Sequence, residues 1–429
     1  MGRWILLALI LNMVCQQKGN CSGSGEKVEA STREQTTGCQ GTSTPSTVNT
    51  SSGVVVGKTI DKTAVFLGIP YAQPPVGKLR LQPPKPAESW KGRLKACDFK
   101  KPCIQNWPQP PGVEVSEDCL YLNVFTTTPR FSDKLSRMPV MVWIHKGSFM
   151  NGAASLYSIE GTIKNLVKRG VVVVTINYRL NFFGFFTTST HKEKGSIHGN
   201  FGLMDQILAL KWVQREILLF GGDPTRVTIF GDSAGGASVS LLTHSPQAKG
   251  LFAQAIMQSG TGYDPWAVAG QFIRGQTSPA SRLISTALDC STREKWAAKD
   301  FEGLLECLQN ATTESIIHEL NSNRLQNLKY FTGPGSILPW TPTIDGEGGV
   351  LPQELEKLAP HRDNIPVIVG STIQELMVVR CAFHSIDVSF LFIDYYTDRQ
   401  FISNWKKDKA DEAMIEQFGK MWTNFAKTG

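Results

Sequence analysis

Short apolar runs alternate with stretches of helical periodicity along the chain from about Gly53 onward. The apolar runs cover residues 140–144, 171–176, 227–230 and 367–369. Residues 171–174 are consecutive valines, and a run without polar alternation is typical of a parallel strand that helices cover on both faces. The alternation of such runs with helical segments predicts an α/β sheet.

The segment before the third apolar run predicts a helix that begins at about Asp205 and extends to Leu219. Its apolar residues recur near helical spacing: Ile207, Leu208, Leu210, Trp212 and Val213. Residues 221–224 read Gly-Gly-Asp-Pro, and glycine and proline commonly end a helix. A strand is expected directly afterwards.

Ser233 lies in a Gly-x-Ser-x-Gly sequence between a predicted strand and a predicted helix. Gly231 and Gly235 flank it, and residues 237–242 are compatible with a helix. A strand, a sharp turn and a helix are what a nucleophile elbow requires, because the turn lifts the serine hydroxyl clear of the sheet edge. The short pattern alone arises often by chance, so its place between strand and helix carries the hypothesis.

A series of further sequence blocks surrounds this serine. The clearest are residues 66–72 (FLGIPYA), 116–123 (SEDCLYLN), 199–206 (GNFGLMDQ), 220–224 (FGGDP) and 258–260 (QSG). Together they closely resemble the type-B carboxylesterase/lipase family, which includes carboxylesterases and cholinesterases, over about residues 53–379. The resemblance implies an α/β-hydrolase fold with a mostly parallel central sheet and helices on both faces. It also implies a serine carboxylic-ester hydrolase that forms an acyl-serine intermediate from small-molecule esters, without metal or organic cofactor.

By the family's pattern, Ser233 is the catalytic nucleophile and Glu375 is the acid that orients the catalytic base. A serine hydroxyl is a weak nucleophile at neutral pH, so it needs a base and an oxyanion hole. Residues 365–375 resemble the family segment that ends in this carboxylate. The family usually has glycine after it, whereas this chain has Leu376, which leaves a surface glutamate as the alternative interpretation.

The loop that contains His145 resembles the family's oxyanion loop, and the histidine belongs to that loop's motif rather than serving as the base. The resemblance implies oxyanion donors from the backbone amides of Gly147, Ser148 and Ala234. Lys146 and Ser148 stand where the family has or favours glycine, and side chains there narrow the acyl site. A tuned substrate pocket and a decayed site are the two interpretations of this departure.

The catalytic histidine of the family has no matching motif in this sequence. The family carries it on a loop well beyond the acid, and after Glu375 the only histidine is His384. Residues 414–429 resemble the helix that follows the histidine loop, so we expect the C-terminal part of the fold to be incomplete. The sheet edge and core that this exposes should make the expressed chain poorly soluble. The alternatives to an active enzyme are a catalytically inactive binding protein of the esterase fold, and a truncated isoform or gene model of an active carboxylesterase.

The N-terminal region predicts a signal peptide and a flexible leader. A short positive head precedes the apolar residues 4–14, which fits a secretory signal peptide over residues 1–18. Residues 19–52 are rich in Ser, Thr, Gly and Gln and cannot bury enough apolar surface to order themselves. The esterase domain is then expected over residues 53–429, secreted or in the lumen of the secretory pathway.

Most of the nine cysteines are expected to pair, because the secretory pathway is oxidising. Cys15 belongs to the predicted signal peptide. The family resemblance implies the pairs Cys103–Cys119 and Cys290–Cys307. It leaves the following cysteines unassigned: Cys21, Cys39, Cys97 and Cys381.

Asn310 is the leading candidate for glycosylation among three acceptor triplets, the others being at Asn20 and Asn49. The net charge is +7 with Lys and Arg scattered along the chain, so we expect no nucleic-acid partner. Beyond the signal peptide, no stretch supplies the about 20 apolar residues of a membrane-spanning helix. The acyl and alcohol preferences and the oligomeric state stay open.

Overall fold

The computed structural model describes residues 45–105, 113–127, 137–188, 193–269, 279–322, 325, 338–371, 391–392 and 409–429. Among these residues, a ten-stranded sheet follows the order β1-β2-β3-β5-β7-β6-β8-β9-β10, and β4 pairs with β2. The strands are β1 (Ser46–Thr50), β2 (Gly53–Ile60), β3 (Thr63–Pro70), β4 (Arg93–Lys95), β5 (Tyr121–Thr127), β6 (Met138–Ile144), β7 (Val172–Ile176), β8 (Gly222–Asp232), β9 (Gln254–Gln258) and β10 (Val367–Gly370).

The part of the sheet from β7 to β10 is wholly parallel. Strand β6 pairs with β7 and β8, and β9 pairs with β8 and β10. The part from β1 to β5 is joined by antiparallel pairs along the sheet. Because the carboxyl ends of parallel strands meet at one edge, β6, β8, β9 and β10 all lead into loops at the same edge. The predicted α/β sheet with a mostly parallel centre is confirmed.

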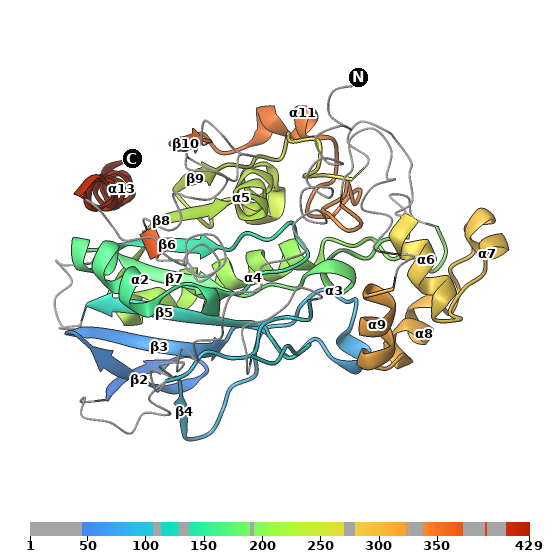
Figure 1. The fold of residues 1–429 in the computed structure, drawn as a ribbon, viewed down its shortest axis with the longest axis horizontal. Helices are drawn as coiled ribbons and strands as arrows, with labels where there is room; N and C mark the ends of the chain where they lie inside the picture. The colour runs from blue at the N-terminus through green and yellow to red at the C-terminus, as the bar shows by residue number, and fades with distance from the viewer. Residues whose placement is uncertain are drawn as a thin grey trace, which may run out of the picture. The chain divides into compact units, whose positions relative to one another are not determined.

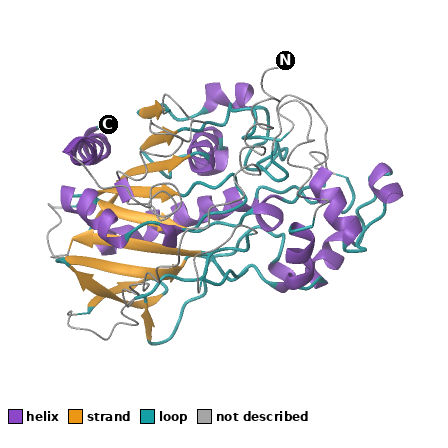
Figure 2. Ribbon diagram, in the orientation of Figure 1, coloured by secondary structure: helices purple, strands orange, loops and turns teal. Residues whose placement is uncertain are grey.

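Helices cover both faces of this sheet (Figure 1). Residues of α4 (Phe201–Glu216) and α5 (Ala234–His244) share a buried cluster with Val142 and Ile144. Residues of α2 (Ile159–Asn165) and α13 (Lys409–Thr428) share another cluster with Met141 and Trp143. Successive side chains of a strand point to opposite faces, so these two helix pairs lie on opposite sides of β6. Figure 2 shows the strands between them. The helices are α2 (Ile159–Asn165), α3 (Asn181–Phe185), α4 (Phe201–Glu216), α5 (Ala234–His244), α6 (Pro279–Ala287), α7 (Arg293–Ala297), α8 (Leu304–Asn310), α9 (Thr313–Leu320), α11 (Leu355–Leu358) and α13 (Lys409–Thr428).

The ordered sheet begins earlier than the sequence predicted. Residues 46–50 form β1, which pairs antiparallel with β2, so the expected flexible leader over residues 19–52 was wrong at its C-terminal end. Ser51 N–H also donates to Glu216 Oε2 at 3.1 Å, which fastens the hairpin to the end of α4. Only Val48 of β1 is buried, and a short polar strand gives no apolar run to recognise. Residues 1–44, including the predicted signal peptide, lie outside the described residues.

Helix α4 begins at Phe201, before the predicted start near Asp205. Asn200 precedes it with a left-handed φ of 58°. Its side chain exchanges two hydrogen bonds with the backbone of Thr343: Nδ2 donates to the carbonyl at 2.7 Å, and Oδ1 accepts from the amide at 2.9 Å. The start of the helix is therefore set by a distant contact that local periodicity cannot report.

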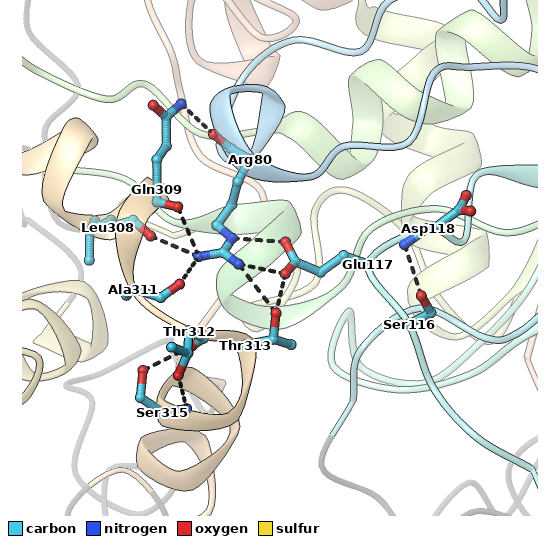
Figure 3. A network of polar contacts seen from close by, with 10 residues as sticks. All are labelled: Arg80, Ser116, Glu117, Asp118, Leu308, Gln309, Ala311, Thr312, Thr313 and Ser315. Carbon is cyan, nitrogen blue, oxygen red and sulfur yellow. Dashed lines mark hydrogen bonds and ion pairs between the residues drawn. The ribbon is translucent and has the colours of Figure 1, made fainter.

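A buried ion pair joins the α8–α9 region to the N-terminal part of the chain. Arg80 Nε and Nη2 donate to the two carboxylate oxygens of Glu117 at 2.8 and 2.6 Å. Arg80 Nη1 also donates to the Leu308 carbonyl at 3.0 Å, and Thr313 Oγ1 donates to Glu117 at 2.6 Å. Figure 3 shows these groups converging on the guanidinium and the carboxylate. Every strong donor and acceptor of the pair is thus satisfied away from water.

Candidate active site

Ser233 occupies a sharp turn between β8 and α5. Its φ is 56° and its ψ is −120°, a backbone region that a residue with a side chain adopts at a cost of about 1–3 kcal/mol. Ser233 N–H donates to the Gln258 carbonyl at 2.8 Å, and Ala237 N–H donates to the Ser233 carbonyl at 2.8 Å. The strand, turn and helix predicted from the sequence are present, with the strained serine at the apex.

Glycines leave the space that this turn needs. A methyl group at Gly235 would lie 2.1 Å from the Ile144 carbonyl oxygen, and one at Gly260 would lie 2.1 Å from the Ser233 carbonyl oxygen. A methyl group at Gly231 would lie 2.5 Å from the Gly235 carbonyl carbon. All three distances are shorter than real Cβ contacts allow, so no larger residue fits without moving the backbone.

The loop that follows β6 folds back on itself beside this turn. Its φ angles are 125° at Gly147, 57° at Ser148 and 57° at Phe149. A methyl group at Gly147 would lie 2.0 Å from the Asn151 carbonyl oxygen, and Asn151 N–H donates to the Gly147 carbonyl at 2.9 Å. Ser148 and Phe149 thus adopt left-handed backbone although they carry side chains, which marks a loop held in shape by its surroundings.

Backbone amides are available as donors at this edge of the sheet. Ile144 of β6 lies opposite Gly231 of β8, which brings the loop beside the elbow. Among the described residues, the N–H groups of Gly147, Ser148 and Ala234 donate to no other group. Preorganised amides without an internal acceptor are suited to hold a developing oxyanion.

His145 supports the loop as a neutral imidazole. Its ring stacks on Tyr178 with centroids 4.3 Å apart, and its Nδ1 lies 2.8 Å from the Lys146 carbonyl oxygen. Tyr178 Oη donates to the His145 carbonyl at 3.0 Å. Burial lowers the pKa of His145 to about 4, against a smaller raising effect of the Lys146 carbonyl, because a charged ring would lose its hydration. The ring is committed to the loop, in agreement with its expected place in the motif.

Two buried amide side chains that the sequence did not single out also fix the loop. Gln105 Nε2 donates to the Gly152 carbonyl at 3.1 Å, and its Oε1 accepts from the Gly152 amide at 2.9 Å. Asn181 Nδ2 donates to the Ile104 carbonyl at 2.7 Å, and its backbone N–H donates to the Phe149 carbonyl at 2.8 Å. Single polar residues of this kind leave no periodic signal in a sequence.

Three aromatic side chains pack together next to the loop. The Phe149 ring lies 5.2 Å from that of Phe185 and 6.3 Å from that of Trp266, measured between centroids. Phe149 is fully buried, and Trp266 packs against the same core cluster. Phe149 and Phe185 are thus part of the core that supports the loop at Ser148, and Trp266 is half-buried beside them.

The model of the Carboxylesterase family matches residues 44–383 of this chain. This chain belongs to the carboxylesterase family. It is 38% identical to Carboxylesterase 1D of Rattus norvegicus over 354 residues, which are 78% of this chain and 59% of the rat protein. It is 36% identical to liver carboxylesterase of Sus scrofa over 352 residues, which are 77% of this chain and 58% of that protein. The chain thus spans about three fifths of the length of the curated carboxylesterases it matches.

Solved esterase structures have the same fold. A thermophilic pNB esterase superposes with a TM-score of 0.72 and 26% identity, covering 90% of this chain and 91% of that one. A carboxylesterase of Geobacillus stearothermophilus superposes with a TM-score of 0.61 and 33% identity, covering 77% of this chain and 62% of that one. These likenesses confirm the α/β-hydrolase fold predicted from the sequence.

The predicted acid and the only later histidine, Glu375 and His384, lie outside the described residues. The approach to Glu375 is described. Gly370, the last residue of β10, pairs with Gln258 in parallel register and accepts a hydrogen bond from Ser259 N–H at 2.7 Å. The chain therefore leaves β10 at the sheet edge that carries Ser233, and the role of Glu375 stays a prediction.

Both disulfides implied by the carboxylesterase resemblance are present. Cys103 is bonded to Cys119 with Cα atoms 5.0 Å apart, and Cys290 is bonded to Cys307 with Cα atoms 5.5 Å apart. Cys97, which the sequence left unassigned, is also disulfide-bonded. The remaining unassigned cysteines lie outside the described residues: Cys21, Cys39 and Cys381.

In the part of the chain that the structure describes, no helix has the length and apolar character to cross a membrane, and no group of three His, Cys, Asp or Glu side chains is arranged to hold a metal ion.

Proposed function

We propose that the chain is a secreted serine carboxylic-ester hydrolase in which Ser233 attacks the ester carbonyl. The observation that carries this proposal is the strained backbone of Ser233, with a φ of 56°, at the apex of a strand, turn and helix. Strain of this kind persists only where the surroundings impose it, and it clusters at catalytic sites. Membership of the carboxylesterase family supports the class of reaction.

The proposed reaction has two steps. In acylation, Ser233 Oγ bonds to the acyl carbon while the bond from that carbon to the alcohol oxygen breaks, and the alcohol leaves with the serine proton. In deacylation, water attacks the same carbon, and the acid leaves as the serine hydroxyl is restored. We assign the oxyanion of both steps to the amides of Gly147, Ser148 and Ala234, which have no internal acceptor among the described residues.

The proposed reaction also needs a general base for the Ser233 hydroxyl. Among the described residues, no histidine makes a hydrogen bond with the Ser233 hydroxyl. His145 is bonded within its own loop, and His244 lies at the far end of α5, where its Nδ1 is 2.8 Å from the Ser240 carbonyl. We assign to Glu375 the role of orienting the base, as the family's pattern implies.

The substrate class follows from the walls of the site. Phe149 and Phe185 are buried, and Trp266 is half-buried beside Phe149, so the surroundings of the site are apolar, and we infer that the acyl or alcohol part held there is a hydrocarbon group rather than a charged one. The Cβ of Ser148 occupies space that glycine would leave open, which favours small acyl groups.

The secretory route is part of the same proposal. The disulfides Cys103–Cys119 and Cys290–Cys307 fit an oxidising compartment. Asn310 is exposed at the end of α8, and Thr312 of the same triplet accepts a hydrogen bond from Ser315 N–H at 3.1 Å. We infer that Asn310 carries a glycan, because an exposed turn between helices leaves room for one.

A second candidate function is a binding protein of the esterase fold that turns over no ester. The absence of a histidine bonded to Ser233 among the described residues favours it, because without a base the residual catalysis over water is only about 10³–10⁴-fold. The retained elbow glycines Gly231 and Gly235 argue for the enzyme, since a binding role does not require an exposed serine at a strained turn.

The deciding experiment is covalent labelling of the purified chain with a fluorophosphonate probe, together with hydrolysis of p-nitrophenyl butyrate. We expect labelling at Ser233, located by peptide mass spectrometry, and turnover that Ser233→Ala abolishes. A chain that neither labels nor turns over the ester, but whose tryptophan fluorescence saturates with a non-hydrolysable ester analogue, contradicts the enzyme and supports the binding protein.

A further inference from the structure

The C-terminal helix α13 is linked to the strand that supports the elbow. Trp422 Nε1 donates to Gln258 Oε1 at 3.1 Å, and both side chains are buried. Gln258 is the last residue of β9, and its backbone carbonyl accepts the hydrogen bond from Ser233 N–H at 2.8 Å. One residue therefore receives a hydrogen bond from the helix through its side chain and a hydrogen bond from the elbow through its backbone.

Gln258 also supports the first turn of α5. A methyl group at Gly236 would lie 2.7 Å from the Gln258 carbonyl oxygen, so the start of the helix rests directly on this peptide. In the register of the sheet, Gln258 lies opposite Asp232, the residue before Ser233. A shift of the Gln258 backbone would therefore move the turn that holds the serine.

Helix α13 is positioned firmly enough to transmit such a constraint. Trp422 is 7% exposed and shares a buried cluster with Phe230 of β8. The Arg169 guanidinium bonds to the Glu416 carboxylate, with Nη2 and Oε2 2.6 Å apart. Gly419 lies close to the C-terminal end of α2 and the residues after it: a methyl group there would lie 2.5 Å from Arg169 Nε. Apolar packing holds the helix on the sheet, and the indole hydrogen bond to Gln258 joins it to the end of β9.

We propose that Trp422 is a positioning residue for the esterase reaction and that it acts through Gln258 on the backbone of Ser233. This inference rests on the proposed function. A displacement of a reacting group by about 1 Å costs up to a hundredfold in rate. We therefore expect loss of the indole donor to slow the reaction of Ser233 in a protein that remains folded.

The test compares the rates of fluorophosphonate labelling and the kinetics of p-nitrophenyl butyrate hydrolysis in matched variants of the full chain. Trp422→Phe keeps an aromatic ring in the cluster and removes the donor. Gln258→Leu keeps the side-chain size and removes the acceptor, while the carbonyl that holds Ser233 remains. We expect either variant to label roughly tenfold more slowly, with kcat reduced and KM unchanged, because the bond positions the nucleophile without touching substrate. The double variant should lose no more than the singles, since all three lack the same bond.

Trp296→Phe is the matched control. Its buried indole N–H has no hydrogen-bond partner among the described residues, and α7 lies away from the elbow. This variant loses the same volume of core and should label at the wild-type rate. Gln258→Leu, which leaves the indole in place and removes its acceptor, carries the test if Trp422→Phe does not fold.

The possible failures are distinguishable. Wild-type labelling rates in Trp422→Phe and Gln258→Leu would overturn the positioning role and leave the proposed function intact. Losses that multiply in the double variant, or that Trp296→Phe reproduces, would overturn it as well, because they indicate general loosening of the core. A wild-type chain that does not react with the probe at all would refute the proposed function, and this inference with it.

Discussion

Gly235 lies against Ile144 so closely that a methyl group on its Cα would sit 2.1 Å from the Ile144 carbonyl oxygen. This contact presses the first turn of α5 against the end of β6, from which the loop with Gly147 and Ser148 departs. The candidate nucleophile and the candidate oxyanion donors are thus brought together at one backbone contact. Substitution of this glycine tests the whole arrangement.

Gly235→Ala is expected to slow fluorophosphonate labelling of Ser233 by roughly a hundredfold, because the backbone must shift by most of an ångström to admit the methyl group. Overpacking of this kind also lowers the free energy of unfolding by about 1–3 kcal/mol. Labelling kinetics and urea denaturation measure the two effects. Gly370→Ala is the control, since no atom lies within 4 Å of its added Cβ and its φ is ordinary; equal effects of the two substitutions would contradict the steric explanation.

The sequence predicted the parts of this fold that local patterns dictate. Parallel strands such as β6 and β7 are continuous apolar runs because both of their faces are covered, and the elbow was predicted because strand, glycine, serine and helix follow one another directly. The loop around Ser148 was assigned only through the family resemblance. Its left-handed backbone follows from contacts with Gln105 and Asn181, which are distant in the sequence.

The parts that were missed depend on long-range pairing. Strand β1 has one buried residue, Val48, and exists because β2 supplies its hydrogen bonds. The bond from Trp422 to Gln258 joins residues 164 positions apart, and no periodicity connects them. In each case the determining interaction lies between elements, so a pattern read along one segment contains no trace of it.

Ser148→Gly is expected to widen the acyl preference. Ser148 has a φ of 57°, which glycine adopts without strain, but glycine loses more chain entropy on folding, so the two effects of about 1 kcal/mol nearly cancel in stability. Removal of the Cβ opens space worth about one methylene, and the ratio of kcat/KM for a butyrate over an acetate ester should rise roughly tenfold.

Ser148→Ala separates the two contributions of this side chain. It keeps the Cβ and removes only the hydroxyl, so the butyrate-to-acetate ratio should stay at the wild-type value. A ratio that rises as much in Ser148→Ala as in Ser148→Gly would show that the hydroxyl, and not the Cβ, limits the site.

Glu117→Gln is expected to lower the free energy of unfolding by about 3–5 kcal/mol, because it leaves the buried guanidinium of Arg80 without a counter-charge. The two side chains are 7% and 6% exposed. Glu114→Gln breaks the ion pair with Lys101, whose side chains are 76% and 56% exposed, and should cost less than about 1 kcal/mol. Urea denaturation of both variants at neutral pH measures the difference, and similar losses would contradict a special role for burial.

The buried imidazole of His145 should lower the free energy of unfolding in acid. Its folded pKa of about 4 lies below the value of about 6.5 that an unfolded histidine has. As the pH falls below 6.5 the unfolded chain takes up a proton that the folded ring does not, so the contribution is complete above pH 6.5 and declines by about 3 kcal/mol down to pH 4.

Denaturation curves between pH 7 and pH 4 should show this slope in the wild type and a shallower one in His145→Asn. His318→Gln, which replaces a side chain that is 82% exposed, should keep the wild-type slope. An unchanged slope in His145→Asn would mean that the buried imidazole is not the group that resists protonation, and that the loop beside Ser233 owes its acid sensitivity to other groups.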